Sequence, residues 1–534
     1  MAIFTKFMPG QRAAKRSVAI EEAANWQRST SLFKPASTEY DLVAQLTYMS
    51  ALATANVGRE NLFQKTAELG YSTSGYFQRV HLVAQRLNYD YARACQLVAD
   101  STDNEVVRSL LLRFSSSLAS GEPETVFLAR ETDITLEQYS RKYERDLESL
   151  RKWTDAYVAL MVSVTLVVVV SLVSMMIYSV GTVFILGMAT VMIGVAVLGD
   201  WIIYRTSPVE PKTHRRAEKS RTQDQMFAVA KVLLPAGALI GAAVGLVFSV
   251  GAGMVAAGLA VAPVGIMAFI DDRRVDQQDR DVSTFLRSLG SIVGAIGSTV
   301  TEGLERLNQR SLASLEQGVR RLHVRLRSGI RPDLCWDRFI SETGSELVDR
   351  SVSTFWDTIK LGGDPDQIGL LSSLFALKIS LMRENRKLVS QTFTYLMLPL
   401  HAVLIIILLF VTEVMVVFAS QLNDIQKHAL VGADPTTTGG TDVTNVLAFA
   451  SPDINFIRGF ALVVTIVLTI VDAWSPHATA GGHHHRVWLY AAAMMLLSGL
   501  ALMFVPQIVG GLFHSVAGGV TTNPLASPSA VPTP

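Results

Sequence analysis

Charged side chains are scarce in this sequence. Asp, Glu, Lys and Arg make up 17% of the 534 residues, whereas soluble proteins average about 25%. Hydrophobic residues account for 49% of the chain. This composition excludes an ordinary soluble protein and indicates an integral membrane protein. The formal net charge of +1 is uninformative by itself, so the distribution of charge along the chain carries the argument.

Cysteine is also nearly absent. Cys95 and Cys335 lie far apart in two polar regions, so we predict two buried thiols rather than a disulfide. A run of three histidines at 483–485 lacks the i, i+4 spacing of a helical zinc site. We therefore expect no metal site.

Motifs of the common catalytic families are missing. The sequence has no phosphate-binding P-loop, no Gly-x-Ser-x-Gly and no His-Glu-x-x-His. We expect no enzymatic activity and no cofactor, so any energy from nucleotides has to come from a partner. The basic N-terminal segment 1–36 contains no apolar run, which predicts no cleavable signal peptide and a cytoplasmic N-terminus.

Apolar runs long enough to cross a bilayer are abundant. A span needs about 20 apolar residues, and the fourth and sixth runs are short, so the count is open by one either way. Seven runs are present, at 156–178, 182–203, 232–249, 254–270, 394–419, 455–471 and 487–509. The expected fold is an all-α polytopic membrane protein with about seven transmembrane helices.

The distribution of basic residues predicts the orientation. Loop 204–231 holds six Lys or Arg residues from Arg205 to Arg221, both included, which predicts a cytoplasmic location. Loop 420–454 has Lys427 as its only Lys or Arg and reads as external. The tail 510–534 has no charged residue and is rich in Pro and Ser, so we expect disordered chain with an external C-terminus.

Two polar, helix-patterned regions alternate with the spans. Region 37–155 precedes the four spans of 156–270, and region 271–393 precedes the three spans of 394–509. Each region has the size of a domain. We predict two cytoplasmic helical bundles, an arrangement that suits a scaffold coupling the cytoplasm to the bilayer.

The two polar regions share a sparse pattern. Glu105, Phe114 and Gly121 recur with the same spacing at Glu346, Phe355 and Gly362, which favours an internal duplication. A Gly-acid-Pro sequence then ends a helix in each region. It forms either a simple turn or an exposed contact for a partner, at Gly121, Glu122, Pro123, Gly363, Asp364 and Pro365.

Basic helices lead from both polar regions into the membrane. Arg141 to Lys152 precedes the first span, and Lys378 to Lys387 precedes the fifth, with no Gly or Pro at either junction. Continuous helices of this kind could transmit a movement from cytoplasm to bilayer. The alternative is that their cations anchor to anionic headgroups.

Arginines are concentrated at 306–331, where Glu316 is the single acid. With the loop at 204–231 they predict positive surfaces for an acidic protein partner, the alternative being lipid headgroups. Nucleic acid is not expected, because no aromatic residues interleave the arginines. The predicted docking residues are Arg215, Arg216, Lys219, Arg221, Arg306, Arg310, Arg320, Arg321, Arg325 and Arg327.

Within the spans, small and ionisable residues stand out. Gly237, Gly241 and Gly245 form a stripe that predicts close helix packing, within the subunit or in the homodimer that we expect. Glu413 and Asp472 are costly in hydrocarbon and are therefore candidate functional groups. A secondary transporter coupled through Glu413 is the rival hypothesis.

Several stretches resemble the type II secretion system F superfamily, and most closely its archaellum-type branch of membrane platform proteins. The resemblance covers most of 37–509 and is strongest in the first half. It rests on LTYMSALATA at 46–55, Gly70-Tyr71, Asp90-Tyr91, Arg113-Phe114 through Gly121-Glu122-Pro123, Tyr139 through Tyr157, Asp472-Ala473 and Gly481-Gly482.

This resemblance implies two helical F domains in one chain. It further implies a hexameric cytoplasmic ATPase docked on their basic faces, and pilin-like or archaellin-like subunits passed from the membrane into a growing filament. Loop 420–454 and tail 510–534 match no motif of the family. Tad-type pilus and type II secretion platforms share the superfamily and stay open as alternatives, although Tad platforms usually divide these halves between two proteins.

Overall fold

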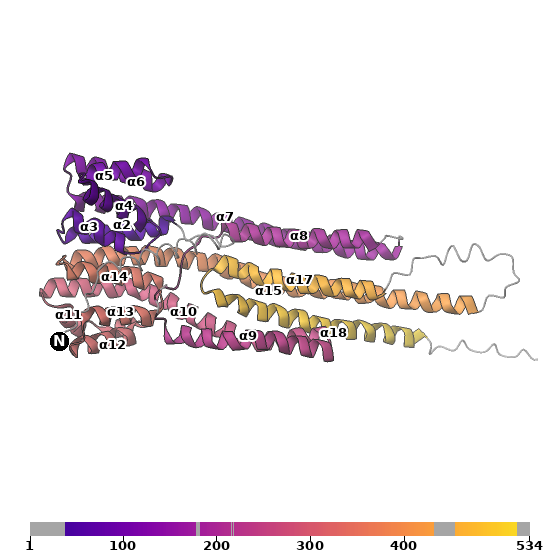
Figure 1. Ribbon diagram of the computed structural model, residues 1–534. Helices are drawn as coiled ribbons and strands as arrows, with labels where there is room; N and C mark the ends of the chain where they lie inside the picture. Colours follow the sequence, from indigo (N-terminus) through magenta and orange to yellow (C-terminus); the bar gives the residue numbers. More distant parts are fainter. Residues whose placement is uncertain (1–37, 178–181, 215, 217, 432–453, 521–534) are drawn as a thin grey trace, which may run out of the picture. The chain divides into compact units, whose positions relative to one another are not determined.

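We describe a computed structural model of the chain over residues 38–177, 182–214, 216, 218–431 and 454–520 (Figure 1). Arg215, segment 1–36, most of loop 420–454 and the end of tail 510–534 lie outside these residues. The described part holds sixteen α-helices and no named strand. The predicted all-helical fold is confirmed. The chain forms two compact units, and helix α7 passes from the first into the second at Ser140.

The first unit contains a bundle of short helices around an aromatic core. Phe114 stacks on Phe63 and on Phe127, with ring centroids 5.5 and 5.0 Å apart, and burial of these rings stabilises the bundle. The bundle consists of α2 (Thr38–Thr54), α3 (Arg59–Glu68), α4 (Ser74–Leu87), α5 (Tyr91–Asp100), α6 (Glu105–Ser120) and the start of α7 (Glu124–Ile177).

The second unit begins its own bundle with the end of a long helix. Trp336 packs edge-on against Phe339 and lies near Phe285 and Phe355 in the core. The bundle consists of the end of α10 (Val250–Ile296), α11 (Val300–Arg306), the 3-10 turn η1 (Gln309–Leu312), α12 (Glu316–Arg327), α13 (Pro332–Thr343), α14 (Glu346–Lys360) and the start of α15 (Pro365–Val431).

The two bundles repeat one another element by element. Helices α3 and α11, α5 and α13, α6 and α14, and α7 and α15 each begin 241 residues apart, whereas α4 and α12 begin 242 apart. Phe114 and Phe355, both buried, are one such pair. So are Gly121 and Gly362, which both have positive φ and follow the ends of α6 and α14. The repeated pattern seen in the sequence is therefore a repeated fold.

Seven helices are long and apolar enough to cross a membrane, in agreement with the predicted seven spans. They are α7, α10 and α15 together with α8 (Thr182–Thr206), α9 (Arg221–Val247), α17 (Ile454–Ala480) and α18 (Val487–Val520). In Figure 1, α11–α14 gather at one end of the second unit, and α9, α17 and α18 extend away from them. The 3-10 turn η2 (His484–Arg486) joins α17 to α18.

Three of these helices run far beyond their apolar stretches. Helix α7 has 54 residues, α10 has 47 and α15 has 67, so bundle and membrane segments share unbroken helices. No glycine or proline interrupts α7 or α15 where the bundle part of the helix passes into its apolar part. Pro399 lies further along α15, within the apolar part. The predicted continuity at both junctions is confirmed.

Glycines allow α10 to pack closely on two neighbours. A Cβ on Gly241 would lie 2.7 Å from the Cβ of Ala257, and one on Gly237 would lie 2.9 Å from Val261. The stripe Gly237, Gly241 and Gly245 therefore packs against α10 within the chain, the first of the two alternatives left open by the sequence. On its other side α10 meets α18 through Gly251, Gly258 and Gly265, which recur every seven residues.

Candidate functional site

A buried polar cluster joins four of the membrane helices. We call it the polar centre, and each of its side chains is at most 2% exposed. Its members are Tyr157 of α7, His401 of α15, Thr469 and Asp472 of α17, and Ser498 of α18.

His401 is the hub of this centre. Its Nδ1 lies 2.6 Å from a carboxylate oxygen of Asp472, and its Nε2 lies 2.8 Å from the Ser498 hydroxyl. Ser498 is also 2.7 Å from the hydroxyl of Thr469. The Tyr157 hydroxyl donates to the other oxygen of Asp472 over 3.1 Å.

Polar groups in hydrocarbon are costly unless they are bonded internally. Sliding or rotating α15 against α17 would separate His401 from Asp472 and break the 2.6 Å contact between them. The polar centre therefore holds these helices in one register. Asp472 was singled out from the sequence, but His401 was not. The available signal was an ionisable residue inside an apolar run, two positions after Pro399.

Two further polar pairs lie among the membrane helices. The hydroxyl of Ser475 donates to Asp200 over 2.7 Å, joining α17 to α8. Glu413 of α15 pairs with Arg458 near the start of α17 at 3.2 Å. Glu413 thus has an internal cationic partner, which the sequence interpretation did not include.

A second cluster, which we call the charge network, lies where the membrane helices meet the second bundle. Asp272, Asp276 and Asp279 occupy successive turns of α10. Their partners come from α15, from η2, from the chain before α9 and from Ser345, the N-cap of α14. Asp272 binds Arg486 and Lys212, Asp276 binds Lys387 and Lys212, and Asp279 binds Arg383 and the Ser345 hydroxyl.

The charge network shows which groups the basic residues of α15 bind. Arg383 and Lys387 face aspartates of α10 rather than the membrane surface. Arg386 is 8% exposed and donates to the Thr479 carbonyl over 3.0 Å and to the Ser207 hydroxyl over 2.7 Å. These three cations bind within the protein, so the headgroup-anchor alternative does not apply to them.

Several predicted docking residues are neutralised by acids from neighbouring helices. Arg216 pairs with Asp337 at 2.7 Å and with Asp349 at 2.6 Å. Arg321 and Arg325 both pair with Glu342 of α13. Counting charges along 306–331 missed these acids because folding brings them from outside that segment.

The other predicted docking residues are more exposed. Arg306 pairs with Glu302 one turn earlier, Arg327 lies 3.9 Å from Glu305, and the Lys219 ammonium lies 3.9 Å above the Phe227 ring. Arg310 of η1, Arg320 of α12 and Arg221 at the start of α9 are exposed, and the described part of the chain offers none of them an ion-pair partner.

Burial alone would raise the pKa of Glu342, but hydrogen bonds and charge from Arg325 and Arg321 outweigh burial and hold the pKa below its usual value.

Burial raises the pKa of the Cys95 thiol to about 12 and also raises that of Cys335. Both cysteines are free and buried, as predicted. Within the described residues, no group of three His, Cys, Asp or Glu side chains is placed to hold a metal ion.

The predicted Gly-acid-Pro turns differ in detail. In the first bundle, Gly121 caps α6, Pro123 precedes α7, and Glu122 accepts from Ser117 over 2.8 Å. In the second bundle, the left-handed residue is Gly362, and Gly363 is buried against Ile368 and Thr358. Asp364 caps Asp366 at the start of α15, and Pro365 is the first residue of that helix.

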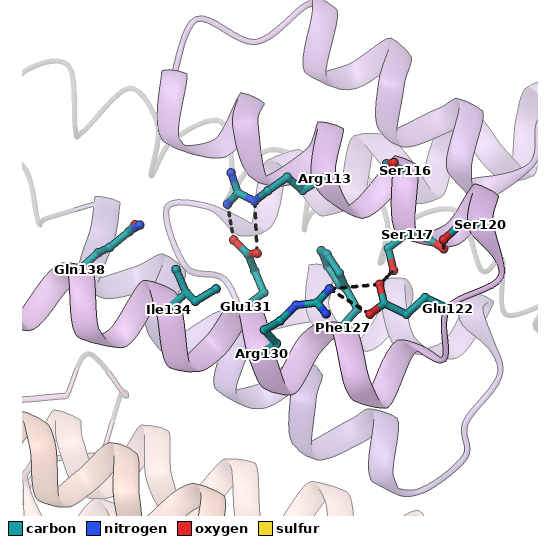
Figure 2. Close-up of a pocket in the computed structure, with 10 residues that line it drawn as sticks. All are labelled: Arg113, Ser116, Ser117, Ser120, Glu122, Phe127, Arg130, Glu131, Ile134 and Gln138. Atoms are coloured by element: carbon teal, nitrogen blue, oxygen red, sulfur yellow. Dashed lines mark hydrogen bonds and ion pairs between the residues drawn. The ribbon is translucent and has the colours of Figure 1, made fainter.

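A polar groove of about 520 Å³ lies beside the first turn, between α6 and α7 (Figure 2). Arg113 binds Glu131 across it, and Arg130 binds Glu122 at 2.9 Å. Ser116, Ser120, Ile134 and Gln138 complete much of its lining. Counted 241 residues on, the second bundle has Thr354 and Ser372 in place of Arg113 and Glu131. The second bundle therefore has no counterpart of the Arg113–Glu131 ion pair at these positions.

Seven long apolar helices, three of them continuous with helical bundles, define a multi-pass membrane protein. Comparison with known proteins finds two relatives of similar length. Over 488 residues it is 24% identical to flagella accessory protein J of Methanocaldococcus jannaschii, covering 87% of this chain and 84% of that protein. Over 461 residues it is 23% identical to flagella accessory protein J of Methanococcus voltae, covering 82% and 79%.

The chain is therefore a distant homologue of the flagella accessory proteins J of these two organisms. No family model matches the chain, and no solved structure matches it.

Proposed function

We propose that this protein is the membrane platform of an archaellum-like filament assembly machine. The observation that carries the proposal is homology over 87% of the chain, a length that cannot be confined to one bundle or to the membrane helices alone. In this proposal regions 37–155 and 271–393 are cytoplasmic F domains. The platform is non-catalytic, receives work from a hexameric ATPase and passes pilin-like subunits into the filament.

The long helices support a mechanical role. Helix α15 is held to α10 by the charge network and to α17 and α18 by the polar centre. A displacement of the second bundle would therefore move these membrane helices together. This is the coupling that a platform between a cytoplasmic motor and membrane-embedded subunits requires.

For the docking surface of the ATPase we propose Arg310, Arg320 and Arg327 on the second bundle. All three are exposed, and the first two have no acid within ion-pair distance in the described chain. Exposed charges of one sign steer an oppositely charged partner and raise the association rate. Arg216, Arg321 and Arg325 contribute less in this proposal because they already bind carboxylates.

The test is binding of the assembly ATPase to the detergent-solubilised full-length protein. Charge reversal by Arg310→Glu and Arg320→Glu should weaken binding at least tenfold and reduce its salt dependence. Arg79→Glu and Arg86→Glu, at exposed positions on α4, serve as the matched control and should leave binding unchanged. Equal binding by wild type and the Arg310→Glu, Arg320→Glu variant would refute this docking surface.

A further inference from the structure

Four cations lie together at the bundle-facing end of the α9–α10 hairpin. Arg221 and Lys231 belong to α9, and Arg273 and Arg274 belong to α10. Arg274 is half-buried and the other three are exposed. In the described residues none of the four pairs with a carboxylate, and Asp224 is the one exposed acid on this part of α9. We call these four residues the hairpin cations.

Apolar stripes lead directly to these cations. On α9 the side chains of Val232, Leu239 and Leu246 are 66%, 72% and 89% exposed and lie on one face. Lys231 stands where that stripe begins. Only 11% of the most apolar stretch of α9 is buried inside the protein, against 44% for α15, so most of α9 is left uncovered by the rest of the described chain.

On helix α10, too, an exposed apolar stripe ends at a basic residue. Ile266 and Ile270 are 48% and 60% exposed, and Arg273 follows on the same face one turn later. The contacts of Gly237 with Val261 and of Gly241 with Ala257 set the antiparallel register of the two helices. Extending this register places Lys231 opposite Met267 and Arg221 opposite Gln277, so Arg273 and Arg274 lie at levels between the two cations of α9.

The hairpin cations differ from the basic residues of α15 in having no carboxylate partner in the described residues. Arg383 and Lys387 at a similar boundary are satisfied by Asp279 and Asp276. The neighbouring Asp271 is also satisfied, by Thr222 and Gln223. The acids near this end of α10 therefore bind within the protein, whereas the hairpin cations have no carboxylate partner in the described residues.

We propose that the hairpin cations form a binding surface for anionic phospholipid headgroups in the leaflet nearest the second bundle. Exposed acyl-facing stripes ending in cations match the two parts of an anionic lipid, and each cation near such a surface adds to the attraction. This proposal is independent of filament assembly. It assigns Arg221 to the membrane rather than to a protein partner.

The experiment uses the full-length protein in vesicles of equal phosphatidylglycerol and phosphatidylcholine, with retained lipids counted by native mass spectrometry after extraction. The hairpin variant is Arg221→Gln, Lys231→Gln, Arg273→Gln and Arg274→Gln. The control removes four exposed cations from the second bundle, by Arg287→Gln, Arg310→Gln, Arg320→Gln and Arg331→Gln. Should the hairpin variant misfold by circular dichroism, Lys231→Gln with Arg273→Gln replaces it.

Wild type and control should retain phosphatidylglycerol over phosphatidylcholine by about tenfold or more, which is the scale set by a few attractive charges. The hairpin variant should approach equal retention. Soluble glycerol phosphate in excess should displace nothing. The proposal is overturned if wild type shows no preference, if the hairpin variant keeps it, if the control loses it equally, or if glycerol phosphate displaces the lipid.

Discussion

At the scale of single residues, buried polar side chains determine the arrangement of the membrane helices. His401 uses both ring nitrogens, one toward Asp472 and one toward Ser498, and all three side chains are fully buried. An imidazole and a carboxylate removed from water are stable only as a bonded pair. Loss of His401 leaves Tyr157 as the partner of Asp472, and loss of Asp472 leaves Ser498 as the partner of His401.

We predict that His401→Leu and Asp472→Leu will each destabilise the protein by about 3–5 kcal/mol, the usual cost of breaking a buried pair. The double variant should be less destabilised than the sum of the two, since no uncompensated charge is left. Thermal unfolding in detergent, analysed as a double-mutant cycle, gives the coupling. Additive effects would show that the pair does not act as a unit.

Glu342 provides a residue-scale test outside the membrane. Its lowered pKa means that its stabilising contribution is present above the unfolded-state pKa of about 4.3 and is lost as pH falls through the lower, folded-state pKa. Glu342→Gln should lower the unfolding midpoint at pH 7, and the difference from wild type should shrink as the pH falls through the folded-state pKa. The exposed Glu144, changed to Gln, is the control; a difference for Glu342→Gln that stays constant as the pH falls would contradict the account.

Predictability from the sequence also differs from residue to residue. Local features were accessible: the buried Cys95 and Cys335, the repeated Phe114 and Phe355, and the capping Gly121 all follow from neighbouring sequence. Non-local pairings were not. Glu342 neutralises arginines 17 and 21 positions away, and His401 meets Asp472 across 71 positions, which no periodicity encodes.

At the scale of elements, the contact between α10 and α15 distinguishes the second bundle from the first. Gly290 and Gly369 bring the two backbones together, and a Cβ on Gly290 would lie 2.4 Å from the Pro365 carbonyl oxygen. Counted 241 residues back, the first bundle has Met49 and Leu128 at these positions. Backbone contact at one end and the charge network at the other hold α10 and α15 together.

Gly290→Ala should therefore destabilise the protein by about 1–3 kcal/mol, the range for overpacking, even though alanine favours helices. Gly459→Ala in α17 is the matched control, because nothing lies within 4 Å of its added Cβ. It should be neutral or stabilising. The measurement is the unfolding midpoint of each variant. Equal midpoint changes in Gly290→Ala and Gly459→Ala would contradict the close-packing explanation.

Element types and spans were largely predictable, because apolar runs and helical periodicity extend over many residues. Element lengths were not. The span predicted at 254–270 lies within a helix of 47 residues, and that at 394–419 within one of 67. Hydropathy marks where a helix enters lipid, whereas the helix itself continues as long as its backbone bonds are satisfied.

At the scale of the whole molecule, the same bundle occurs twice with different surfaces. The first bundle has the charged groove of Arg113, Glu131, Arg130 and Glu122, and the second has the exposed arginines of η1 and α12. Under the proposed platform function, these two surfaces would meet different partners.

The central claim is that the protein is a filament assembly platform, and deletion of its gene tests this most directly. Electron microscopy of the deletion strain should show no filaments while the filament subunits accumulate in the membrane. Wild type should restore filaments and the docking variant Arg310→Glu, Arg320→Glu should not, although it inserts into the membrane normally. Filaments of normal number and length in the deletion strain would contradict the account.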